Sequence, residues 1–225
     1  MSHKRSLQSS SLRTAGLKFK LTKVQRSIIV GNLLGDGHLE SQTNGKTYRL
    51  KIEHSISQEA YVNWQYQKLA NLVGTPPRVK LKSLTGKVSQ NYKFDTLSSS
   101  SLRFFGQSFY QDGKKKIPRI IKKLLTPLAL AVWFMDDGSI KSNQHRALIL
   151  NTQCFDESDL KKLQQALAEN FGIETVLRKQ KEGKQIYILS QSVEKFIEII
   201  SPYLLSSMKY KLGMTNLRLT QLPKK

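Results

Sequence analysis

Hydrophobic positions along the chain gather in two similar runs, residues 28–37 and 129–138, which read IIVGNLLGDG and ALAVWFMDDG. Each run is mainly apolar and closes with Asp-Gly. The two closing aspartates, Asp36 and Asp137, divide the chain of 225 residues so that each run opens roughly one half of it. This arrangement predicts an internal repeat.

Helix start signals precede both runs. Thr22 and Gln25 have the spacing of a capping box, in which side chains satisfy free N–H groups at a helix start. Thr126 is a favourable N-cap, and Pro127 follows at the first helical position, where its missing N–H costs nothing. The two runs are therefore predicted to be core helices.

Each helix is expected to stop at its aspartate, because Gly37 and Gly138 can take the left-handed conformation just past a helix end. A carboxylate is unfavourable there, since the C-terminal end of a helix carries the negative pole of the macrodipole. A divalent cation would offset the charge, and two such ends together would form an all-oxygen site that suits magnesium or calcium. The alternative is a common Asp-Gly turn, which does not explain the two matching helices.

Small residues indicate that the two helices pack closely. Gly31 and Gly35 lie four positions apart and would let another backbone approach. In the second run Ala131 precedes the bulkier Met135 by the same spacing, so the match is partial. We expect Gly31, Gly35 and Ala131 at the helix interface. Neither run has the roughly 18 to 20 apolar residues that span a bilayer, and no membrane partner is expected.

Periodicity beyond the two runs repeats one order of elements in each half. In the first half it predicts a strand over 48–54, a helix over 58–73, a hairpin of 78–82 with 88–95, and a helix over 98–110. In the second half it predicts a strand over 147–153, a helix over 156–171, a hairpin of 174–181 with 184–189, and a helix over 192–205. The order is typical of an α+β fold with two similar halves.

The boundaries follow from this order. We predict a basic N-terminal tail (1–22), a first half (23–111), a connecting segment with a short helix (112–125) and a second half (126–225). The composition of the tail resembles an organellar transit peptide, although an appended leader or a phosphate-binding arm would look similar. We expect an intracellular protein, with the mitochondrion or chloroplast as candidate compartments.

The charge balance indicates an anionic polymer as partner. The chain has 37 Lys and Arg against 16 Asp and Glu, a formal charge of +21. Duplex DNA carries about one charge per 1.7 Å of axis, which suits so many cations, although a generic basic surface is the alternative. One cysteine, Cys154, excludes an internal disulfide, and the four histidines lack zinc-site spacing.

Strand alternation selects candidate nucleic-acid contacts. A two-stranded ribbon fits the major groove, where Arg and Lys pair with guanine edges and Gln and Asn with adenine edges. Base readers and phosphate contacts are not separable from the sequence. The candidates are Arg49, Lys51, Arg78, Lys80, Lys82 and Gln90 in the first half, with Gln153, Arg178, Gln180 and Gln185 in the second.

The two motifs together resemble the paired motifs of the LAGLIDADG homing endonucleases. The first copy is residues 29–37, IVGNLLGDG, and the second is residues 130–138, LAVWFMDDG. Asn32 and Leu34 depart from the pattern in the first copy, and Val132 replaces a glycine in the second. The resemblance covers nearly the whole chain from Lys23 onward. It implies a two-motif monomer of two pseudo-symmetric αββαββα halves, with motif helices at the interface and antiparallel sheets forming a DNA-binding saddle.

The resemblance also implies the chemistry. Asp36 and Asp137 would be the metal ligands, one for each scissile phosphate, with Glu53 and Asn151 reaching toward the metals from their strands. A lysine is implied in each half, Lys115 (or its neighbour Lys116) and Lys211. Asp136 is expected to face solvent or cap the turn. The cofactor would be Mg²⁺, with Mn²⁺ as a substitute and Ca²⁺ supporting binding without cleavage.

The leading hypothesis is a site-specific endonuclease that cuts both strands of an asymmetric double-stranded DNA target and leaves 3′ overhangs. A maturase that binds RNA and assists splicing is the second hypothesis. A catalytically silent DNA-binding protein is the third, although the intact acids Asp36 and Asp137 favour the nuclease.

Overall fold

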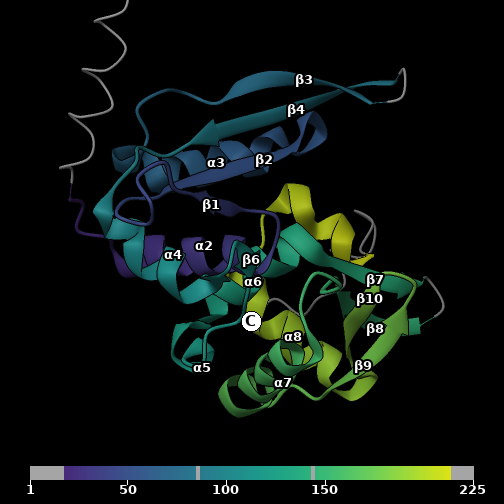
Figure 1. Ribbon diagram of the computed structural model, residues 1–225. Coiled ribbons are helices and arrows are strands. Elements are labelled where there is room, and N and C mark those ends of the chain that lie inside the picture. The colour runs from purple at the N-terminus through teal and green to yellow at the C-terminus, as the bar shows by residue number, and fades with distance from the viewer. Residues whose placement is uncertain (1–17, 85–86, 143–144, 214–225) are drawn as a thin grey trace, which may run out of the picture.

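Two helices, α2 (Lys23–Leu34) and α6 (Pro127–Asp137), pack against each other at the centre of the molecule (Figure 1). The computed structural model describes residues 18–84, 87–142 and 145–213. Both predicted caps are present. Thr22 and Gln25 exchange the two capping-box hydrogen bonds, and the Thr126 side chain accepts from the Ala129 N–H.

Each of these helices opens one copy of the same αββαββα order. The first copy continues with β1 (His38–Glu40), β2 (Arg49–Ser55), α3 (Glu59–Leu69), β3 (Arg78–Leu84), β4 (Lys87–Asp95) and α4 (Arg103–Phe109). The second continues with β7 (Gly138–Ser142), β8 (His145–Leu150), α7 (Glu157–Phe171), β9 (Thr175–Gln180), β10 (Gly183–Ile188) and α8 (Ser190–Ile200). The predicted α+β fold class is confirmed.

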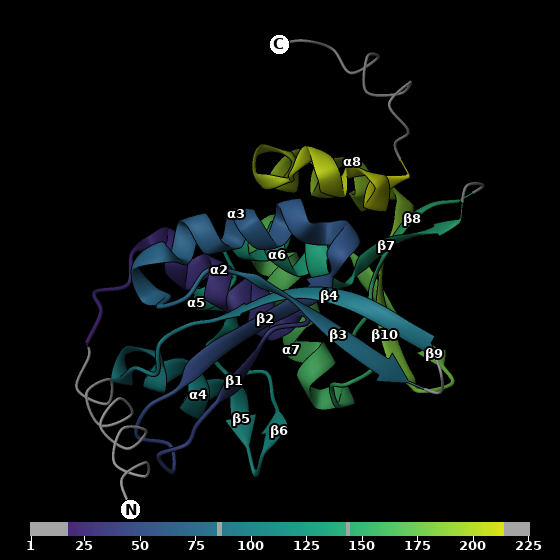
Figure 2. The same cartoon turned by 90° about the horizontal axis from the view of Figure 1, so that it is seen from above.

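The two sheets repeat one topology. Both are four-stranded and antiparallel, with the orders β1-β2-β4-β3 and β7-β8-β10-β9. Helix α3 packs on β2 and β4 of the first sheet, and α7 and α8 pack on the second. Figure 1 shows the first sheet above the central helix pair and the second sheet to its lower right, and Figure 2 shows the same arrangement from above. The internal repeat is therefore a repeat of structure as well as of motif.

Short elements complete the described chain. Between the halves lie a small hairpin and one helical turn: β5 (Tyr110–Gln111), β6 (Lys114–Lys115) and α5 (Ile121–Leu124). The 3-10 turns are η1 (Ile56–Gln58), η2 (Ala70–Leu72), η3 (Ser100–Leu102), η4 (Ser201–Tyr203) and η5 (Ser206–Leu212). The predicted tail falls largely on residues 1–17, which lie outside the described residues.

Two local expectations are wrong. Gly37 does not have a positive φ and Gly138 is extended (φ −79°, ψ 149°), so neither forms a left-handed helix end. Both are instead close-approach positions, because an added Cβ would lie 2.7 Å from Cβ of Asn32 and 2.1 Å from a ring carbon of Phe134. The strand predicted over 147–153 ends at Leu150, which leaves Gln153 in a turn.

The contact between α2 and α6 depends on the two predicted glycines. A Cβ on Gly31 would lie 2.5 Å from Cβ of Val132, and a Cβ on Gly35 would lie 2.4 Å from Cβ of Asp136. The residues opposite the glycines are thus Val132 and Asp136, one turn apart, whereas the expected contact Ala131 is buried but is not among these nearest atoms. The missing side chains let the two backbones approach.

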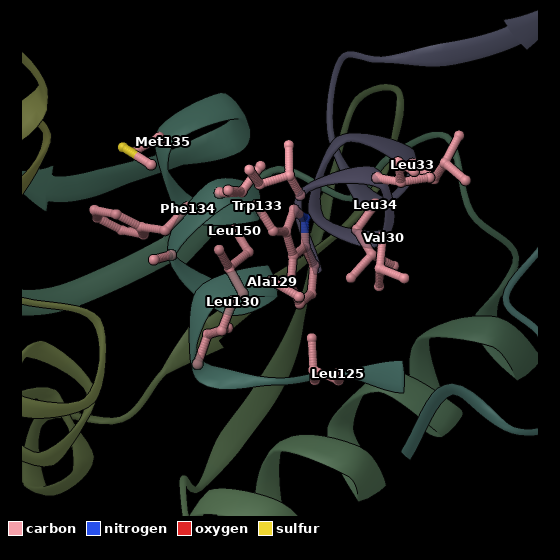
Figure 3. Close-up of a cluster of buried hydrophobic side chains, with 14 of the residues drawn as sticks. Val30, Leu33, Leu34, Leu125, Ala129, Leu130, Trp133, Phe134, Met135 and Leu150 are labelled. Atoms are coloured by element: carbon pink, nitrogen blue, oxygen red, sulfur yellow. The ribbon is translucent and has the colours of Figure 1, made fainter. Parts of the chain in front are cut away.

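Apolar packing surrounds this crossing. Figure 3 shows buried side chains from both helices, including Val30 and Leu34 of α2 and Trp133 of α6. Residues 129–136 of α6 are all buried, so the helix is enclosed on every side and not merely on one face. Within the described residues, no helix combines the length and apolar character that crossing a membrane requires.

We predict that Gly31→Ala lowers the free energy of unfolding by about 1–3 kcal/mol, the usual cost of overpacking a core. The added methyl group would also meet the main-chain oxygen of Ala129 at 2.7 Å, which cannot rotate away. Denaturant titration followed by circular dichroism measures the effect. Gly74→Ala is the matched control, because its methyl group would meet only the flexible end of Leu97 at 2.9 Å. Equal stability of the two variants would contradict a close helix crossing.

Candidate active site

The ends of α2 and α6 bring three aspartates together. Asp36 follows Gly35, the C-cap of α2, and its side chain is 52% exposed, whereas Asp136 is buried and Asp137, the last residue of α6, is partly buried. The Asp36 backbone N–H donates to Oδ2 of Asp136 at 3.2 Å, which links the two helix ends. The predicted pair of metal ligands thus lies at one centre, together with a third carboxylate.

Asp136 differs from expectation, because its side chain points into the first half and not to solvent. The hydroxyl of Tyr61 on α3 donates to its Oδ1 at 2.7 Å. His54 on β2 lies between two carboxylates, with Nε2 3.7 Å from Oδ1 of Asp136 and Nδ1 3.6 Å from Oδ2 of Asp36. One ligand atom from each of Asp36, His54 and Asp136 falls within 4.8 Å of the others, a grouping that could hold a metal ion.

Sequence reasoning missed His54 and Tyr61. The signal for His54 was present, because strict alternation on β2 puts it on the same face as Leu50 and Ile52, toward the helices. No local signal marks Tyr61, whose position in a helical pattern indicates only a core residue. Its hydroxyl finds its partner on a residue 75 positions away.

Burial and mutual repulsion perturb the carboxyl groups. Burial, followed by the charge of Asp36, raises the pKa of Asp136 to about 8. The same two causes, with Asp136 as a third, raise the pKa of Asp137 to about 8. Burial lowers the pKa of His54, so its imidazole is neutral at pH 7 and adds no charge. Two of the three carboxyl groups are therefore held in the uncharged form at pH 7, and a bound cation would favour their ionised form.

A lysine from each half reaches these helix ends. Lys115 on β6 donates from Nζ to the main-chain oxygen of Gly35 at 2.7 Å, and Lys211 on η5 donates to that of Asp136 at 2.5 Å. Gly35 and Asp136 hold the same position in the two motifs, so the two lysines are equivalent. Burial lowers the pKa of both. Lys116 pairs with Asp156 at the surface, so Lys115 is the one near the site.

Of the two residues expected near the metals, Glu53 and Asn151, the first lies away from them. Glu53 lies on the outer face of β2, 2.8 Å from Nζ of Lys82 and 3.3 Å from that of Lys80. Burial would raise the pKa of Glu53, but hydrogen bonds from these lysines and Asn91 hold it at about 2. Its carboxylate therefore lies on the outer face of the first sheet and not at the helix ends.

Asn151 does lie beside the centre. Its N–H and Nδ2 both donate to the main-chain oxygen of Asp137, at 3.0 and 2.9 Å, while Gln185 donates to its Oδ1 at 2.5 Å. It contacts the backbone of the aspartate and not its carboxylate. Asn151 therefore fixes the turn that follows α6.

The first sheet presents a cationic outer face. Arg78, Lys80 and Lys82 of β3 share it with Lys51 and Glu53 of β2, as the strand register requires. Arg49 and Lys51 both pair with Glu40 of β1. Gln90 was predicted to share this cationic face, and that prediction is wrong. It lies opposite Leu81, so its side chain is on the other face of the hairpin.

The second sheet presents a more polar face. Arg178 lies opposite Gln185, and Gln180 opposite Gly183, so the three predicted contacts on this hairpin share one side. The Arg178 guanidinium lies 4.5 Å above the ring of Tyr187. Gln153 lies in the turn after β8, next to Gly183. The equivalent faces of the two sheets therefore carry different side chains.

A fold of two αββαββα halves with acids at crossed helix ends is that of the LAGLIDADG proteins, and the chain belongs to the LAGLIDADG DNA endonuclease family, whose model matches residues 26–196. It is 33% identical over 212 residues to the DNA endonuclease I-ChuI of Chlamydomonas applanata, covering 87% of this chain and 97% of that protein. The match confirms the predicted family and its class of enzyme, the metal-dependent DNA endonucleases.

Two further similarities differ in kind. The chain is 36% identical over 200 residues to the cytochrome b mRNA maturase bI2 of Saccharomyces cerevisiae, covering 83% of this chain but only 47% of that protein. The homing endonuclease I-WcaI, solved bound to its DNA recognition sequence, superposes with a TM-score of 0.82 at 25% identity, covering 94% of each chain. The proteins similar to this chain therefore include both DNA endonucleases and an mRNA maturase.

We predict that the metal-free protein is destabilised by Asp136 as pH rises from the ordinary aspartate pKa of 3.8 to about 8. In this window the unfolded chain has released the Asp136 proton and the folded chain still holds it, so rising pH favours unfolding. The measurement is the free energy of unfolding in EDTA, compared between the unmodified protein and Asp136→Asn.

The difference between the two proteins should shift steadily in favour of the variant across this pH window. Glu157→Gln is the control, because Glu157 is exposed and the Lys184 ion pair lowers its pKa instead. A pH-independent difference for Asp136→Asn would show that the carboxyl group is ionised throughout.

Proposed function

We propose that this protein is a site-specific endonuclease that hydrolyses one phosphodiester in each strand of a long asymmetric DNA duplex and leaves 3′ overhangs. The observation that carries the proposal is the placement of Asp36 and Asp137 at adjoining helix ends, each with a partly buried lysine near the end of its own half. One shared centre with an acid and a lysine from each motif suits one cut in each strand.

The donor set suits a divalent cation. Carboxylate oxygens from Asp36 and Asp137 would hold it, and because burial and the charge of Asp36 raise the pKa of Asp137 to about 8, a cation beside it would favour the ionised form. When bound, the ion would neutralise charge on the phosphate and acidify a water molecule. We propose Mg²⁺ as cofactor, with Mn²⁺ substituting and Ca²⁺ supporting binding alone. A variant of I-DmoI, similar in fold (TM-score 0.53, 15% identity), was solved with its target DNA and manganese.

The protein's own groups supply the remaining steps. Each lysine is held by a carbonyl oxygen at the helix end, so its ammonium group is fixed beside the acids. Lys115 and Lys211 would each stabilise the charge that grows on one scissile phosphate, or orient the attacking water. Because these hydrogen bonds form without DNA, the two ammonium groups would need little reorganisation during the reaction.

The two outer sheet faces would hold the duplex. Arg78, Lys80 and Lys82 on one side and Arg178, Gln180 and Gln185 on the other are suited to groove and phosphate contacts. Because the two surfaces differ, a single copy of the chain would read an asymmetric target, unlike the palindrome that a symmetric dimer reads. We propose that the protein acts as a monomer inside an organelle or cell.

A maturase that binds RNA is the second candidate function, favoured by the similarity to the yeast maturase. The chain spans 47% of that protein, so any maturase activity is a proposal only. Selection of cleaved duplexes from a randomised DNA library with Mg²⁺ tests the nuclease. Splicing of a candidate intron RNA with the purified protein tests the maturase.

We predict that Asp36→Asn and Asp137→Asn each lower the rate of double-strand cleavage at least about 100-fold, because the loss of a metal ligand removes several kcal/mol of transition-state stabilisation. Binding, measured in Ca²⁺ by gel shift, should persist. Asp156→Asn is the control, because this exposed aspartate forms its ion pair with Lys116 at the surface. Undiminished cutting by either variant, or cutting by the unmodified protein in EDTA, would contradict the assignment.

We predict that Lys115→Met slows cleavage by about 10²- to 10³-fold, the usual cost of removing one positioned donor. Lys116→Met is the matched control, because it removes the same charge from the next residue, whose side chain pairs with Asp156 at the surface. Both variants should lose a similar amount of electrostatic attraction to DNA. Equal cleavage rates for the two would show that Lys115 acts only through general charge.

A further inference from the structure

The two motifs differ at the position just before their metal-binding aspartates. The first has Gly35 and the second has Asp136. These two residues face each other across the helix crossing, since a Cβ on Gly35 would lie 2.4 Å from Cβ of Asp136. The carboxyl group of Asp136 therefore occupies space that Gly35 leaves open, and it extends into the first half.

Both oxygens of Asp136 are already used inside the protein. Oδ1 accepts from the Tyr61 hydroxyl at 2.7 Å, and Oδ2 accepts from the Asp36 backbone N–H at 3.2 Å. The residue is only 7% exposed. Although an oxygen of Asp136 belongs to the grouping that could hold a metal ion, hydrogen bonds within the protein occupy both of its oxygens, so we assign Asp136 to fixing the backbone of Asp36.

His54 extends the contact to the Asp36 side chain. Its ring lies 5.1 Å from that of Tyr61 and its Nδ1 lies 3.6 Å from Oδ2 of Asp36. Its Nε2 is buried without a hydrogen-bond partner among the described residues and faces Oδ1 of Asp136 at 3.7 Å. The imidazole thus limits the movement of the Asp36 carboxylate from one side.

Within the described residues, the second half has no equivalent of His54 at the matching position. Leu39 pairs with Leu50, and Ile140, two residues past the matching glycine, pairs with Leu148. The register makes Thr152 the counterpart of His54. Thr152 is buried and its hydroxyl donates to the main-chain oxygen of Lys184, so it does not contact Asp137.

We propose that Asp136, Tyr61 and His54 form a positioning cluster, built across both halves, that fixes Asp36 and leaves Asp137 to be held by other contacts. Asp136 acts here as a positioning residue and not as a metal ligand. The inference rests on the proposed endonuclease function, in which Asp36 and Asp137 each serve one strand. Loss of the cluster therefore slows the cut in one strand more than the cut in the other.

The test uses four variants of the full chain. Asp136→Ala removes both acceptors, whereas Asp136→Asn keeps one acceptor for the Asp36 N–H and offers a donor to Tyr61. Tyr61→Phe removes only the hydroxyl and preserves the packed ring. Tyr66→Phe is the matched control on the same helix, because its ring packs edge-on to Phe94 outside the cluster.

Each duplex carries a different label on each strand, and single-turnover rates are measured for both strands in Mg²⁺. Asp136→Ala and Tyr61→Phe should slow one strand by about 10- to 100-fold, the usual effect of removing a partner that orients a metal ligand. The same strand should be the one that Asp36→Asn slows most. Asp136→Asn and Tyr66→Phe should keep the ratio of the two rates within about 3-fold of the unmodified protein.

A second readout does not depend on cleavage. Mn²⁺ binding to each protein without DNA, followed by the electron paramagnetic resonance signal of the free ion, should weaken by about 10-fold or more in Asp136→Ala and stay nearly unchanged in Asp136→Asn. Equal weakening in both Asp136 variants would make the carboxylate charge the active feature and overturn a positioning role.

The outcomes separate the two proposals. If the selection yields no duplex that the unmodified protein cuts, the endonuclease proposal fails and this inference fails with it. If the unmodified protein cuts and Tyr61→Phe and Asp136→Ala slow both strands equally, the endonuclease stands and the positioning cluster is refuted. Should Asp136→Ala fail to fold, Tyr61→Phe alone decides.

Discussion

The close crossing of α2 and α6 is the constraint on which the rest of the structure depends. It needs residues without side chains at Gly31 and Gly35, and it places two negative helix poles and three aspartates in one partly buried region. Apolar burial of the two helices offsets the cost of gathering these charges. Burial, followed by the charge of Asp36, raises the pKa of both Asp136 and Asp137 to about 8, so a cation at this centre would favour their ionised form.

The lysines act on the same electrostatic problem. Lys115 and Lys211 each bind the carbonyl oxygen of the residue before the aspartate, so they stabilise the helix ends while remaining beside the acids. Both arrive on short elements at the ends of their halves, β6 and η5, and not on the motif helices. The sheets then need only hold the outer surfaces in place, which leaves their exposed residues free to differ between the halves.

Local signals predicted most of the fold. Caps at Thr22 and Thr126, the Asp-Gly ends and the repeated order of elements all depend on residues close in sequence, and the family resemblance supplied the equivalent lysines. Contacts between distant residues were not predicted: Tyr61 and Asp136 are 75 positions apart, and no periodicity links them. The prediction that Glu53 reaches the metals was wrong for a different reason: alternation along β2 already placed Glu53 on the charged face, opposite to the helices.

The difference between Gly35 and Asp136 has a consequence for how such a centre can diverge. In a symmetric dimer of one half, both positions would carry the same residue. Two aspartates would place their Cβ atoms about as close as the 2.4 Å found for a Cβ added to Gly35, which is sterically impossible without separating the helices. Two glycines would remove the carboxyl group that accepts from the Tyr61 hydroxyl and from the N–H of Asp36. A single chain with two halves escapes this restriction, because one motif can supply the space and the other the carboxyl group that fills it.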